Sequence, residues 1–234
     1  MQKISGFALL AVLTAGCQST PFNAHQSRFT NPTVSDDVLV NVPQSDRDGI
    51  TKCRTEWNEM KDRVTIAENN VGQEKQRLNV AEAELDVSED AVSAAKKGLS
   101  VARNSSESTR EHEVDNAQEQ LEGSQARWRS AKSKIAFTEA HIDQLDSEVD
   151  LAKLRVDLAG AKVELAKAQA VSKLDRPHSR DISVSEFQAC VEEEASEVAM
   201  GEVDAAAWEK KVKLRQDALD KRLAVKSASY DKKN

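Results

Sequence analysis

The stretch that decides the fold is residues 50–102, which read ITKCRTEWNEMKDRVTIAENNVGQEKQRLNVAEAELDVSEDAVSAAKKGLSVA. An apolar residue recurs there every seven positions (the a positions): Ile50, Trp57, Val64, Val71, Leu78, Leu85, Val92 and Leu99. Most d positions between them are small: Ala67, Ala81, Ser88, Ala95 and Ala102. A seven-residue repeat of this length predicts a helix that supercoils with a partner, and small d residues let the two axes approach closely.

A second run of the same kind supplies the partner helix. Its a positions are Val114, Leu121, Trp128, Ile135, Ile142, Val149, Val156, Val163 and Ala170. Between the runs, Asn104 and the polar residues after it interrupt the pattern, and Ser108 with Glu111 forms a capping box that restarts a helix. Residues 45–173 therefore predict an antiparallel coiled-coil hairpin with its tip at about 104–108. Facing residues should have numbers that sum to about 214.

A third helix is predicted over residues 182–228, because Pro177 ends the second run and an apolar stripe resumes afterwards. The second run also gains another apolar seam: Phe137, Ala140, Leu151, Leu154, Leu158, Ala161, Leu165 and Ala168. A helix that is apolar on two faces needs two partners. The predicted fold is all-α, a long antiparallel coiled-coil hairpin with a third helix packed on its basal half. Residues 229–234 are expected to form a disordered tail.

The amino terminus has the pattern of an export signal. Lys3 precedes an apolar segment, residues 4–13, and small residues lead to Cys17. The sequence Leu-Thr-Ala-Gly-Cys at 13–17 resembles the lipobox of bacterial lipoproteins. That resemblance implies that residues 1–17 are a signal peptide with a lipid-modified Cys17, palmitate among the acyl chains, and that Gln18 directs the protein to the outer membrane. The alternative is an ordinary secretory signal with an incidental cysteine.

Residues 18–44 are predicted to be a flexible tether. Three of the four prolines occur here (Pro21, Pro32 and Pro43) among polar residues, without a sustained apolar period. The lipid anchor would then put the hairpin in the periplasm, with the third helix on the membrane-proximal half. This plan resembles coiled-coil outer-membrane lipoproteins such as Braun's murein lipoprotein, which is linked to peptidoglycan through a terminal lysine. Because Asn234 is last here, covalent linkage to peptidoglycan is not expected.

Two cysteines remain besides Cys17. Cys53 lies near the start of the first long helix, and Cys190 near the start of the third. Both helices are expected to start at the same end of the bundle in an oxidising compartment, so the sequence predicts a Cys53–Cys190 disulfide. Two buried thiols are the alternative.

Composition and motifs do not favour an enzyme. Charged residues make up 31% of the chain and the net charge of −7 is spread over it, without the basic stripe that nucleic acid requires. The four histidines (His25, His112, His141 and His178) lack the i, i+4 spacing of helical metal ligands and are expected on solvated surface. We expect no metal, no cofactor and no catalytic residue. Trp57, Trp128 and Trp208 occur once per helix and are expected to be packing anchors.

The candidate partner-binding residues are Val80, Val87 and Val101. With Ile66 and Ala94 they share the c position of the first helix, roughly opposite its a/d seam. They predict either self-association or a partner helix, unless they are simply scattered surface valines. The expected function is a non-catalytic outer-membrane lipoprotein that presents a periplasmic hairpin as a scaffold or docking element. The alternative is a periplasmic carrier or chaperone-like protein that binds clients between its helices, which would require a cavity that small d residues disfavour.

Overall fold

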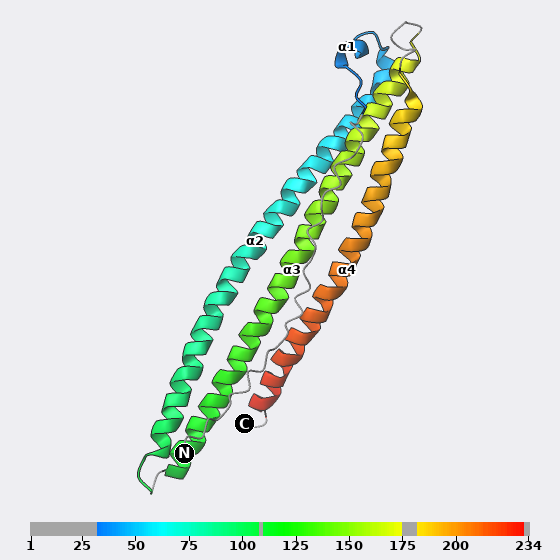
Figure 1. Ribbon diagram of the computed structural model, residues 1–234. Coiled ribbons are helices and arrows are strands. Elements are labelled where there is room, and N and C mark those ends of the chain that lie inside the picture. Colours follow the sequence, from blue (N-terminus) through cyan, green and yellow to red (C-terminus); the bar gives the residue numbers. More distant parts are fainter. Residues whose placement is uncertain (1–31, 108–109, 175–181, 232–234) are drawn as a thin grey trace, which may run out of the picture. The chain divides into compact units, whose positions relative to one another are not determined.

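The computed structural model describes residues 32–107, 110–174 and 182–231. Within these ranges the fold is all-α, without strands, and its elements are α1 (Asp36–Leu39), α2 (Gln44–Arg103), α3 (Arg110–Ser172) and α4 (Val184–Asp231). The three long helices run side by side, with α3 between α2 and α4 (Figure 1).

Local sequence explains where α2 begins and ends. Pro43 is its N-cap, where the missing N–H costs nothing, and Asp46 in the first turn suits the positive end of the helix dipole. At the other end, the Asn104 side-chain amide donates to the Ser100 carbonyl and the Ser105 hydroxyl donates to the Ala102 carbonyl. These bonds satisfy carbonyls that the helix leaves without partners, so the chain turns there.

The predicted antiparallel pairing of the first two long helices is confirmed. Trp128 Nε1 donates to Glu89 at 3.0 Å, Lys134 pairs with Glu84 at 2.6 Å, and Lys173 pairs with Asp46 at 2.9 Å. The residue numbers of these pairs sum to 217–219, a few residues from the expected register. All buried residues of α2 occupy predicted a or d positions: Ile50, Val71, Glu74, Ala81, Ser88, Leu99 and Ala102.

The second apolar seam of α3 is also confirmed, because α4 packs against it. Its buried members include Ala140, Leu151, Ala161 and Ala168. Gly201 of α4 lets the two helices approach closely, since a methyl group there would lie only 2.9 Å from Leu154 Cδ1.

α3 is the helix that joins the other two, because α2 and α4 each pack along it and make few contacts with each other. α4 runs three residues beyond the predicted end of the third helix, and it covers more than the predicted basal half of the hairpin, because Arg222 reaches the Arg129 carbonyl and Ser133, past the midpoint of α3. It stops short of the α2–α3 loop (Figure 1).

The segment before α2 differs from its prediction. Residues 32–44 were expected to belong to a flexible tether, but they fold onto the base of the bundle. Val34 and Val42 are buried in one cluster with Ile50, Val171 and Phe187, drawn from α2, α3 and α4. Prolines and polar residues are typical of a linker, but burial of the Val34 and Val42 side chains is enough to hold this short segment against the ends of the long helices.

Other predictions fall outside the described residues. These are the signal peptide with Cys17, the tether up to residue 31, Ser108 of the capping box, Pro177 and residues 232–234. Among the described residues, no helix combines the length and the apolar character needed to cross a membrane.

Candidate functional site

The distal row, defined as Val80, Val87 and Val101 of α2, is exposed as predicted. Their exposed fractions are 57%, 70% and 71%, although Ala81, Ser88 and Ala102 next to them in sequence are buried. Consecutive residues of an α-helix are turned by about 100° from each other, so each valine lies outside the seam that buries the residue after it. α2 packs on α3 through that seam and makes few contacts with α4. The chain therefore shows a line of apolar side chains to solvent on the distal half of α2.

An open groove of about 860 Å³ lies beside Val80, between α2, α3 and α4. It exists because α2 and α4 both pack on α3 but hardly on each other. The sequence did not predict this cavity, since small d residues indicated a closed seam. Its apolar lining comes from Val80, Phe137, Leu219 and Leu223; its polar lining comes from Gln73, Glu74, Gln76, Arg77, Ser130, Lys134, Thr138 and Gln216.

A buried carboxylate, that of Glu74, lies against the floor of the groove. Glu74 occupies a d position and contacts Arg77 at 2.9 Å and His141 Nδ1 at 3.1 Å. The His141 ring stacks on Phe137 with centroids 5.8 Å apart. His141 was expected on solvated surface, but it is half-buried. The sequence feature that could have indicated a buried partner for His141 is Glu74, a charged residue at a d position in a seam of otherwise apolar or small residues.

Trp128 lines a second hollow, of about 460 Å³, nearer the tip between α2 and α3. Its Nε1 donates to Glu89, and Lys132 Nζ lies 4.6 Å from the ring centroid. Trp57 and Trp208 are likewise half-buried, each with a lysine over the ring. The three tryptophans thus pack at helix seams while one face of each ring meets a cation, which suits their role as packing anchors.

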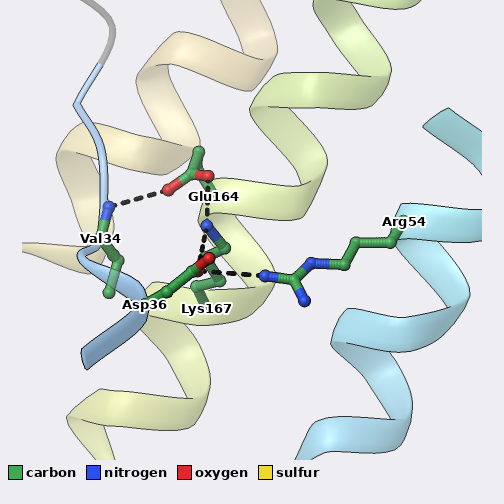
Figure 2. Close-up of polar contacts among 5 residues, drawn as sticks. All are labelled: Val34, Asp36, Arg54, Glu164 and Lys167. Atoms are coloured by element: carbon green, nitrogen blue, oxygen red, sulfur yellow. Dashed lines mark hydrogen bonds and ion pairs between the residues drawn. The ribbon is translucent and has the colours of Figure 1, made fainter. Parts of the chain in front are cut away.

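A charged cluster, the base clamp, holds residues 34–36 against α3 and α2 (Figure 2). Glu164 Oε2 accepts a hydrogen bond of 2.8 Å from the Val34 backbone N–H, and Glu164 Oε1 lies 2.8 Å from Lys167 Nζ. Lys167 and Arg54 each lie 3.0 Å from Asp36 Oδ1. The sequence did not predict this cluster. The one residue that could have indicated it is Lys167, a cation in the part of α3 that is apolar on two faces.

Electrostatics inside the base clamp favour the charged forms. The hydrogen bond and charge of Lys167 lower the pKa of Asp36, and Arg54 adds to the effect. Burial alone would lower the pKa of Lys167, but the hydrogen bonds and charges of Glu164 and Asp36 together outweigh burial and raise it. The base clamp therefore fixes the point at which the preceding segment joins the bundle.

The predicted Cys53–Cys190 disulfide is not formed in the structure, where both residues are half-buried thiols. α2 and α4 pack mainly on different seams of α3, and few of their residues contact each other. Burial raises the pKa of both thiols, helped by Glu56 at Cys53 and by Glu194 and Glu193 at Cys190. Cys17, the predicted lipidation site, lies outside the described residues.

No group of three or more candidate ligands that could hold a metal ion occurs among the described residues. Comparisons with protein-family models, with curated proteins and with solved structures find no match to this chain. The geometry therefore has to support any functional proposal by itself.

Proposed function

We propose that this chain is a non-catalytic outer-membrane lipoprotein that presents a periplasmic coiled-coil hairpin as a docking element for a protein. The lipobox-like sequence ending at Cys17 supports the anchor and the compartment. In this proposal the base of the hairpin, where α4 begins, lies near the membrane, and the end with the α2–α3 loop points away from the membrane.

The observation that carries the docking role is the exposure of the distal row. Soluble surfaces carry single apolar residues routinely, but a line repeated on one helix face marks a place where another surface packs. An amphipathic partner helix would bury such a row through side chains at matching turns. Because the buried seam of α2 is already occupied by α3, the distal row is available for a partner without unfolding the hairpin.

The base clamp supports the same role. An anchored docking element is held in a defined place only if the segment before it is attached to it at a fixed point. Contacts of Val34 with Glu164 and of Asp36 with Lys167 provide that attachment at the base of the hairpin.

The docking role is tested by a photo-crosslinking residue at Val87 in the intact cell. We expect a discrete adduct with one protein. The matched control is Asn116, an exposed residue of α3 in the distal half of the hairpin, which should give no adduct. If Val87 is as silent as Asn116, the hairpin is a passive spacer and the docking proposal is wrong.

The anchor has its own test. Changing Cys17→Ser should abolish incorporation of labelled palmitate and move the protein from the membrane fraction to the soluble fraction. Unchanged membrane association would contradict lipid anchoring and would leave the ordinary secretory signal as the better explanation.

A second candidate function is a carrier that binds its client between the helices, and the groove favours it. Its volume falls in the range of ~300–1,000 Å³ that small-molecule sites occupy, and its lining combines four apolar side chains with eight polar ones. Mass spectrometry of the purified chain should then find a ligand that Leu219→Trp, which fills the groove, displaces. Absence of any ligand from the native chain would exclude this function.

A further inference from the structure

On the exposed face of α2 near the hairpin tip, the residues before Ala94 and the residues after it are arranged almost symmetrically. It contains Val87, Asp90, Ala94, Lys97 and Val101, all exposed. The valines lie seven residues to either side of Ala94, while Asp90 and Lys97 lie four residues before it and three after it. At 3.6 residues per turn, these positions occupy neighbouring stripes of one helix face. We call this set the tip face.

The charges of the tip face have no partner in the part of the chain that the structure describes. Neither Asp90 nor Lys97 takes part in an ion pair or hydrogen bond with another described residue. Ala94 and the neighbouring Gly98 leave the surface flat, since a methyl group at Gly98 would meet nothing within 4 Å. Opposite charges beside small residues and flanked by valines form a surface that is complementary to itself.

We propose that the tip face docks against the tip face of a second copy of this chain, antiparallel and centred on Ala94. The inference rests on the proposed docking role and names its partner. In this arrangement Ala94 faces Ala94 of the second copy, and Val87 faces Val101 of the second copy. A two-fold axis makes every contact twice, so Asp90 of each chain lies beside Lys97 of the other.

Charge selects the antiparallel arrangement. A parallel, in-register pair would place Asp90 against Asp90 and Lys97 against Lys97, and like charges facing each other oppose association. The antiparallel pair instead forms two opposite-charge contacts flanking an apolar centre. The small residues at that centre let the helix axes approach to the short end of the ~8–10 Å range.

The same geometry indicates a weak dimer with overlapping tips. A crossing of two helices over four turns buries less than the ~1,200 Å² typical of stable interfaces. Ala94 lies about 15 Å along the helix from Asn104, where α2 ends, so the two tips overlap while the bases point in opposite directions. The groove between α2, α3 and α4 lies outside the contact.

The first experiment is a charge exchange read by sedimentation of the full chain purified in detergent. Asp90→Lys and Lys97→Asp should each weaken self-association at least tenfold, and the double variant D90K/K97D should restore it. Circular dichroism reports whether each variant keeps its helices. A native chain that sediments as a monomer up to millimolar concentration, or a double variant no better than the single ones, would overturn the proposal.

The second experiment checks the centre and direction of the dimer. Ala94→Cys should form a disulfide-linked dimer under mild oxidation, beyond any background from the native cysteines. Val87→Cys alone should not, whereas a mixture of Val87→Cys and Val101→Cys chains should. Ready linkage of Val87→Cys to itself would show a parallel pair and contradict the antiparallel model of association.

These outcomes separate the two proposals. An adduct between Val87 and a different protein in the cell, with a monomeric purified chain, would support the docking role and exclude the second copy as its partner. Silence of Val87 in the cell together with a monomeric purified chain would exclude both.

Discussion

The two ends of α2 follow the same seven-residue repeat but lie in different surroundings. At the base, Ile50 is buried because residues 32–43, α3 and α4 all contribute to the cluster around it. Near the tip, α2 has α3 as its neighbour, and the c positions of the same repeat are exposed. The contrast shows that the repeat fixes one buried seam along the whole of α2, whereas the number of elements packed around that seam is larger at the base than near the tip. We therefore expect stability to be concentrated at the base and binding at the tip.

The largest effect should come from truncating the centre of the base. Phe187→Ala removes a buried aromatic side chain from the cluster and should lower the free energy of unfolding by about 3–5 kcal/mol, measured by denaturant titration. Val87→Ala at the tip is the matched comparison and should change it by less than about 0.5 kcal/mol. Similar losses for both variants would contradict the contrast between base and tip.

The next effect concerns the base clamp. Lys167→Met keeps the apolar stem but leaves Glu164, which is largely buried, without its cation, so the free energy of unfolding should fall by about 1–3 kcal/mol. Arg54→Ala removes only an exposed partner of Asp36 and should cost less. In limited proteolysis, Lys167→Met should be cleaved within residues 32–43 sooner than Arg54→Ala. Equal resistance of both variants would mean that the apolar contacts alone hold the segment.

The contribution of the base clamp should depend on pH at both extremes. The pKa of Asp36 is lowered from its ordinary value of 3.8, so its contribution is present above 3.8 and disappears as the pH falls through the lower folded value. The pKa of Lys167 is raised above 10.5, so its contribution is present below 10.5 and disappears as the pH rises through the higher folded value. The difference in free energy of unfolding between the native chain and Lys167→Met should be flat between these limits and shrink beyond both. A difference that changes near neutral pH would point to other groups.

The smallest effect compares two glycines. Gly123→Ala in the distal half of α3 meets no neighbouring atom and should stabilise the chain by about 0.5–1 kcal/mol through helix propensity. Gly201→Ala lies where α4 packs on α3, so displacement of Leu154 should cancel most or all of that gain. Thermal unfolding of the two variants measures the difference, and an equal gain at both positions would show that α4 packs loosely.

Much of the architecture follows from periodicity. The a and d positions of α2 predicted its buried face, and the second seam with Ala140, Leu151 and Ala168 predicted that α3 has two partners. These predictions succeed because burial on a helix depends mainly on spacing, which the sequence shows directly.

Features that depend on three-dimensional placement were harder to predict. The base clamp joins Asp36 to Lys167, far apart in the sequence, and no local pattern pairs them. The groove depends on whether α2 and α4 touch, which two separate stripes cannot specify. The Cys53–Cys190 disulfide, which this structure does not contain, likewise depends on how closely α2 and α4 approach at the base, which their separate stripes do not specify. The exposure of Val87 was predictable, whereas the identity of its partner is a proposal.

The most direct test of the account asks whether the distal row is covered in the cell. A Val87→Cys chain is labelled with a membrane-permeable maleimide, once in intact cells and once as dilute purified protein, with Asn116→Cys as the control. If a partner covers the distal row, labelling at Val87→Cys is several times slower in the cell than in dilute solution, while Asn116→Cys reacts equally in both. Equal labelling of Val87→Cys in both settings would mean that nothing covers the row, and it would contradict the claim that the tip is the binding end of this chain.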